Sequence, residues 1–176
     1  MIPIGDSPRS RTRPWVTYAI IAANLAAFLY MLSLPASSPR TVPERRSLAT
    51  EITQDCYGFR NISLTDVDRF VCQWSFQPRE WFDGVEGKLA APSQPRWQVV
   101  VSILTATFMH AGWLHIFGNM LFLWVFGDNV EDRLGHALYL AFYLVAGIAA
   151  SFVQGMVDTA SLVPNVGASG AVAAVL

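Results

Sequence analysis

The sequence predicts an all-α membrane protein, a polytopic bundle of transmembrane helices, from its composition, the distribution of its charges and the length of its apolar stretches. Hydrophobic residues make up 53% of the 176 residues and charged residues 14%, compared with about 25% charged residues in an ordinary soluble domain. Only one basic residue, Arg133, lies beyond Arg96. The net charge of -1 leaves no basic footprint for a nucleic acid, so we expect a lipid bilayer and no nucleic acid as partner.

Three apolar stretches have the length that a transmembrane helix needs, which is about 20 residues for a roughly 30 Å hydrocarbon core. They cover residues 16–34, 99–126 and 137–157. The second is longer than one span needs, so we expect its first part to form a short helix or loop at the surface. A fourth stretch, residues 166–176, is too short to cross. The chain is therefore expected to be the N-terminal portion of a longer protein, ending within its fourth transmembrane helix.

Charges that precede the first stretch predict the orientation of the bundle. Arg9, Arg11 and Arg13 favour a cytoplasmic N-terminus over residues 1–15. Residues 16–34 then form the first transmembrane helix, residues 35–98 an external loop, and residues 99–176 a core with spans 2 to 4. An internal turn at residues 127–136 and an external one at residues 158–165 join these spans. A cleaved signal peptide is the alternative for the first stretch, because basic residues precede it and small residues follow it.

Polar groups inside the apolar stretches mark a candidate site, because such groups are costly in hydrocarbon and are usually retained for function. His115 and Asn119 lie four residues apart and so share one helix face. Ser169 lies in Gly167-Ala168-Ser169-Gly170, where the glycines allow a close approach of the backbone to a substrate. The orientation described above puts all three side chains near the external ends of their helices. We therefore expect one site, at one depth in the membrane.

These motifs resemble the rhomboid family of intramembrane serine proteases. The matching runs are His110-Ala-Gly-Trp-Leu-His115-Ile-Phe-Gly-Asn119, Gly127-Asp-Asn-Val-Glu131-Asp-Arg-Leu-Gly135 and Gly167-Ala-Ser169-Gly170. The resemblance implies that Ser169 is the nucleophile, and that His115 and Asn119 donate hydrogen bonds to the oxyanion. It implies a structural role for His110 and a general-base histidine on a later span, beyond Leu176. We therefore expect the full-length protein to be an enzyme and the chain as given to be inactive.

The resemblance also implies transmembrane protein substrates that are cleaved near the external membrane face, and no cofactor. The alternative function is that of a non-catalytic relative that binds transmembrane helices. The run from Arg13 to Thr17 is similar to bacterial members, and we expect a multi-pass protein of a bacterial plasma membrane. A metal site is not expected, because the spacing of His110, His115 and His136 matches no compact ligand pattern.

Three further patterns give expectations about packing and covalent links. Cys56 and Cys72 both lie in the external loop, where they form a disulfide in an oxidising compartment or remain two unpaired thiols. Glu131 is expected to form a salt bridge with Arg133 that fixes the second and third spans. Gly147, Ser151 and Gly155 follow the small-residue spacing that is typical of packed membrane helices.

Overall fold

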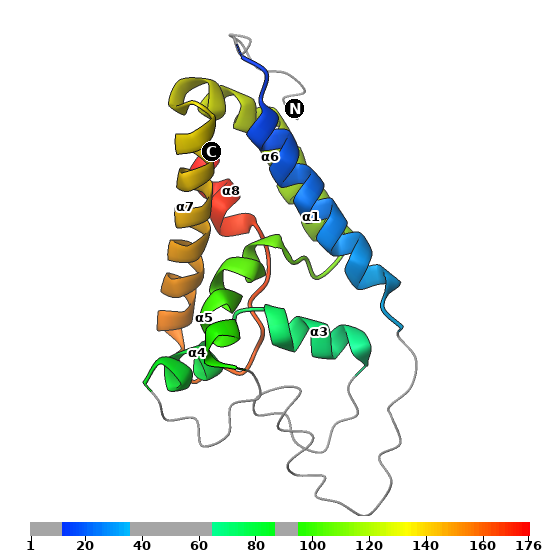
Figure 1. The fold of residues 1–176 in the computed structure, drawn as a ribbon, viewed down its shortest axis with the longest axis vertical. Helices are drawn as coiled ribbons and strands as arrows, with labels where there is room; N and C mark the ends of the chain where they lie inside the picture. The colour runs from blue at the N-terminus through cyan, green and yellow to red at the C-terminus, as the bar shows by residue number, and fades with distance from the viewer. Residues whose placement is uncertain (1–11, 36–64, 87–94) are drawn as a thin grey trace, which may run out of the picture.

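The computed structural model describes residues 12–35, 65–86 and 95–176. These residues form helices joined by short loops, with one isolated antiparallel bridge between Phe76 and Asn165. Figure 1 shows α1, α6 and α7 as long helices, with α8 between α6 and α7 and with α3, α4 and α5 gathered at the end of the molecule away from the N-terminus. The predicted all-α membrane bundle is therefore confirmed for the described part of the chain.

Two helices are long and apolar enough to cross a membrane, namely α1 (Trp15–Ser33) and α7 (His136–Val157). α1 begins directly after Pro14, because a proline fixes a helical φ and has no N–H to leave unpaired at a helix start. Both helices agree with the apolar stretches in the sequence to within about one residue, since length and hydropathy alone define such elements. The protein is thus an integral membrane protein.

The second apolar stretch is not one straight helix. It contains α5 (Arg96–Thr105), the 3-10 turn η1 (Ala106–Phe108) and α6 (Trp113–Leu134), and the chain bends by 76° between the two helical parts. The expected short helix at the start of this stretch is therefore confirmed. The bend places residues 109–112 in a loop, and this loop carries His110.

The turn expected at residues 127–136 is shorter than predicted, because α6 continues as a helix to Leu134. Only Gly135 separates α6 from α7, and it has a φ of 77°, which favours glycine. The helix continues because Glu131, which is 0% exposed, faces the protein interior. A charge in that position must be paired, and the helical register provides the pairing.

The partners of the Glu131 carboxylate are the first residues of α1 and α7, and not Arg133. Its carboxylate accepts hydrogen bonds from Val16 N at 2.9 Å, and from Thr17 N and Thr17 Oγ1 at 2.8 and 2.7 Å. Its Oε1 also lies 2.5 Å from His136 Nδ1. The expected Glu131–Arg133 salt bridge is therefore wrong, because these donors from two other helices occupy the carboxylate. They join α1, α6 and α7 at one end of the bundle.

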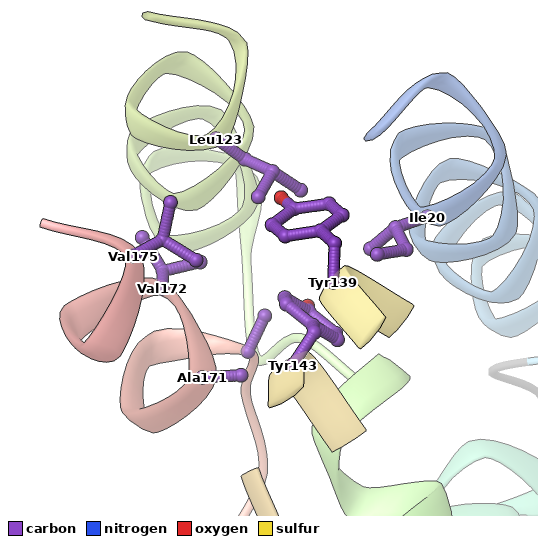
Figure 2. Packing of buried hydrophobic residues seen from close by; sticks show 8 residues of the cluster. Ile20, Leu123, Tyr139, Tyr143, Ala171, Val172 and Val175 are labelled. Carbon is purple, nitrogen blue, oxygen red and sulfur yellow. The ribbon is translucent and has the colours of Figure 1, made fainter. Parts of the chain in front are cut away.

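The core lies where α1, α6 and α7 meet α8 (Ser169–Val175). Figure 2 shows Ile20 of α1, Leu123 of α6 and Tyr139 and Tyr143 of α7 pointing toward one another, next to Val172 of α8. Small residues bring these helices close together. A Cβ on Gly147 would lie 2.9 Å from Thr107 Cγ2 and 3.4 Å from Ala171 Cβ. The predicted packing role of the small residues in the third span is confirmed at Gly147.

Two short helices, α3 (Asp66–Trp74) and α4 (Pro78–Val85), come from the segment between α1 and α5. α3 begins with a capping box, in which Thr65 Oγ1 accepts from Asp68 N and the Asp68 carboxylate accepts from Thr65 N. Both helices pack against α5. Cys72 of α3 is disulfide-bonded, and Cys56, the other cysteine of the chain, lies outside the described residues.

Candidate active site

His110 and Asn119 form a buried pair at the start of α6. The two side chains are 1% and 7% exposed, and Asn119 Nδ2 lies 3.0 Å from His110 Nε2. An amide nitrogen can only donate, so His110 Nε2 is the acceptor, and the imidazole proton is on Nδ1. One N–H of the Asn119 amide is thus engaged by His110, and the second remains to donate to another group.

His115 lies on the same face of α6, one turn before Asn119. Its ring packs edge-on against His110, with the ring centroids 5.1 Å apart and the planes at 65°. His115 is only partly buried, in contrast to His110. The two histidines therefore differ in position. His110 is buried and bonded to Asn119, and His115 is partly exposed and faces the loop before α8.

That loop reaches His115 through Gly167. A Cβ on Gly167 would lie 2.5 Å from His115 Cε1 and 2.7 Å from Nε2, and the φ of Gly167 is 129°. Both observations require glycine, because a side chain would collide with the imidazole and L-residues rarely adopt this φ. Gly167 N also donates to Ala106 O at 2.9 Å. The imidazole of α6 is thus packed against the backbone two residues before Ser169.

Ser169 is the first residue of α8 and is exposed, whereas Ala168 before it is fully buried. Its hydroxyl forms no hydrogen bond with the residues that the structure describes. Gly170 after it packs against Ala150 of α7 so closely that a side chain has no space there. The hydroxyl therefore projects from a backbone held on both sides, and its N–H has no partner within the first turn of the helix.

The three residues predicted from the motifs are thus distributed over two elements that meet. His115 and Asn119 come from one face of α6, and His115 contacts the Gly167 backbone that leads into Ser169. Two contacts of the site were not predictable from sequence, namely the pairing of His110 with Asn119 and the bond from Gly167 N to Ala106 O, because both depend on the bend after η1. A group of three or more His, Cys, Asp or Glu side chains that could hold a metal is absent from residues 12–35, 65–86 and 95–176.

The chain is similar to known proteins over this same region. The Rhomboid domain family model matches residues 97–176. Rhomboid-like protein 11, chloroplastic, of Arabidopsis thaliana is 29% identical over 168 residues, which cover 95% of this chain and 57% of the relative. RHOMBOID-like protein 2 of the same plant is 28% identical over 171 residues, covering 89% of this chain and 46% of the relative.

A mitochondrial relative is more similar over a shorter alignment. The presenilin-associated rhomboid-like protein, mitochondrial, of Homo sapiens is 39% identical over 87 residues, covering 48% of this chain and 23% of the relative. No solved structure matches the chain significantly. The chain spans between about a quarter and somewhat over half of the length of these relatives.

The Rhomboid domain match, residues 97–176, covers the part of the chain that contains the three motifs. Two of the three relatives are named as chloroplastic or mitochondrial, so they give no support to the expected bacterial plasma membrane, which stays a prediction. The chain has helices that can cross a membrane, and its residues 97–176 match the Rhomboid domain family.

Proposed function

We propose that the full-length protein is an intramembrane serine endopeptidase, with Ser169 as nucleophile and with His115 and Asn119 as oxyanion donors. The observation that carries the proposal is the contact between His115 and Gly167, because it brings an imidazole of α6 against the backbone that leads into Ser169. A backbone φ of 129° at Gly167, in contact with a partly buried histidine, is a strained arrangement that helix packing alone does not require. It is expected where a donor and a nucleophile must approach the same carbonyl.

In the proposed reaction, Ser169 Oγ attacks the carbonyl carbon of a substrate peptide bond while a general base removes the hydroxyl proton. The family resemblance assigns that base to a histidine on a later helix. The carbonyl oxygen becomes an oxyanion, and its charge is stabilised by the His115 imidazole N–H, the second N–H of Asn119 and the Ser169 backbone N–H. The amine leaves with a proton, and water then hydrolyses the acyl-enzyme.

The His110 contact supports the role assigned to Asn119. An amide side chain that donates into a forming oxyanion must be held in one rotamer, and the 3.0 Å bond to His110 Nε2 restricts that rotamer. The buried position of both side chains also reduces competition from water. Preorganised donors in a dry site do not need to reorient during the reaction, which is why each has a large effect on rate.

The substrates are expected to be transmembrane proteins, and their helices must locally unwind before the site can reach a carbonyl. A helical backbone in hydrocarbon is hydrogen-bonded to itself, so its carbonyls are not available to the three donors. Residues with weak helix propensity near the cut lower the cost of unwinding. We therefore propose that cleavage takes place near the external face, in a segment of low helix propensity.

The test uses the full-length protein in liposomes with a single-span substrate. Ser169→Ala is expected to abolish cleavage, and Ser151→Ala on α7, which is outside the site, to leave it unchanged. Asn119→Ala is expected to lower kcat by about 10² to 10³, the typical effect of losing one oxyanion donor. Cleavage that persists in Ser169→Ala contradicts the assignment of the nucleophile. Substrate binding without cleavage by the unmutated protein supports the non-catalytic alternative.

A further inference from the structure

Residues 76–79, which comprise the end of the α3–α4 link and the first residues of α4, hold the loop that leads into Ser169. Phe76 N donates to Asn165 O at 3.2 Å, and Asn165 N donates to Phe76 O at 2.7 Å, which is a complete antiparallel bridge. Arg79 N donates to Ser161 O at 3.0 Å. We call residues 76–79 the clamp and residues 158–168 the serine loop.

The buried side chain of Gln77 adds a hydrogen bond to the serine loop. Gln77 is 2% exposed, and its Nε2 donates to Leu162 O at 2.6 Å. A buried amide is costly unless it is hydrogen-bonded, and here its Nε2 donates to a backbone carbonyl of the serine loop. The clamp therefore binds the serine loop at residues 161, 162 and 165.

Phe76 fixes the clamp itself to the bundle. Its ring is 0% exposed, and a Cβ on Gly155 would lie 2.7 Å from both Phe76 Cε1 and Cζ. The same ring belongs to a buried cluster with Ile103 and Ala106. The absent side chain at Gly155 thus provides the space that the ring occupies, and the clamp is held against α7 and against the end of α5.

Two backbone hydrogen-bonded contacts, which we call ties, restrict the backbone immediately before Ser169. The clamp holds Asn165, and the Ala106 carbonyl holds Gly167 two residues later. Ala106 packs in the cluster that contains Phe76, so both ties end on the same rigid part of the protein. We therefore expect a displacement of Phe76 to shift Gly167, which contacts His115.

We infer that Phe76 and Gln77 are positioning residues for catalysis, which hold the serine loop so that Ser169 and His115 reach the same carbonyl. This inference rests on the proposed function. Neither side chain touches the reacting atoms, and both act through the serine loop. A shift of about 1 Å in a reacting group costs about 10²-fold in rate. Loss of one tie among several is expected to cost less, about 10-fold.

The first test is Gln77→Leu in the full-length protein, with Gln154→Leu at an exposed position of α7 as the matched control. Gln77→Leu replaces the amide with an apolar side chain of similar size and removes the donor to Leu162 O. We expect kcat to fall about 10-fold with KM within about twofold, because positioning and not binding is impaired. Hydrogen exchange of residues 158–170 is expected to become faster, a readout that is independent of cleavage.

The second test uses a compensating pair. Gly155→Ala is expected to displace the Phe76 ring and to lower kcat, because the new methyl group collides with it. Phe76→Leu combined with Gly155→Ala removes the colliding ring atoms and is expected to restore most of the lost kcat. A merely destabilising effect of Gly155→Ala would be increased, not rescued, by a second core substitution.

Three outcomes separate this inference from the proposed function. A double variant no more active than Gly155→Ala overturns the clamp. Unchanged kcat or unchanged exchange of residues 158–170 in Gln77→Leu, beside an inactive Ser169→Ala, also overturns the clamp and leaves the proposed function intact. Cleavage that persists in Ser169→Ala overturns the proposed function, and the catalytic role of the clamp with it.

Discussion

Gly167→Ala is the substitution for which the structure gives the most direct expectation. A Cβ there lies 2.5 Å from His115 Cε1, and ordinary van der Waals contact begins at about 3.4 Å. The imidazole or the backbone must therefore move by about 0.9 Å. In addition, alanine at a φ of 129° carries a strain of about 1–3 kcal/mol, because that region is nearly restricted to glycine.

Both ways of relieving the collision damage the site. If the ring moves, the His115 donor leaves the position of the oxyanion. If Gly167 changes its φ, its N–H turns away from Ala106 O, and the backbone before Ser169 moves. A displacement close to 1 Å is expected to lower kcat by about 10²-fold. The free energy of unfolding is expected to fall by about 1–3 kcal/mol.

The assay compares kcat for a single-span substrate in liposomes with the denaturant midpoint of the same full-length variants. Gly118→Ala is the matched control, because it makes the same chemical change on α6 at a position with nothing within 4 Å. It is expected to leave kcat unchanged. The reasoning is refuted if Gly167→Ala retains the kcat of the unmutated protein while Ser169→Ala is inactive.

Three other changes test the packing and the covalent structure. Thr17→Val removes the 2.7 Å hydrogen bond to Glu131, and the free energy of unfolding measured by denaturant titration should fall by about 1.5–3 kcal/mol. Thr159→Val, at an exposed position, should be neutral. Equal midpoints for the two variants would contradict a stabilising role of the bonds to Glu131. Gly147→Ala places a methyl group 2.9 Å from a threonine and should cost about 1–3 kcal/mol by the same titration. Reduction of the purified protein should raise its mass by two hydrogen atoms through the Cys72 disulfide, and an unchanged mass would contradict that bond.

The sequence predicted the elements that hydropathy defines and missed those that depend on contacts between helices. α1 and α7 agree with their apolar stretches because each is one uninterrupted run of the required length. The position of the bend after η1 was not predictable, since apolar residues continue on both sides of His110. At the bend, the hydrogen bond between His110 and Asn119 joins the loop to α6, and hydropathy carries no signal for such a bond.

At the end of α6, the sequence predicts a turn where the structure has a helix. Asp128, Glu131, Asp132 and Arg133 make residues 127–136 polar, and a polar segment between apolar stretches is typical of a turn. The structure keeps these residues helical, because Glu131 finds donors on Val16 and Thr17 of α1. No local pattern distinguishes a buried, paired carboxylate from a solvated one, since the partners lie more than 100 residues away in sequence.

The two ends of α6 are held by bonds of different kinds, and this difference bears on how a substrate reaches the site. At the C-terminal end, a buried carboxylate accepts bonds from α1 and α7, and hydrogen bonds to charged groups contribute about 1.5–3 kcal/mol each. At the N-terminal end, the site depends on the uncharged pair of His110 and Asn119 and on the glycine contact at His115. Uncharged bonds contribute about 1 kcal/mol each, so the site end opens at a lower cost than the charged end. Under the proposed function, we therefore expect an incoming peptide to displace contacts at the site end of α6 while α1, α6 and α7 remain assembled at the other end.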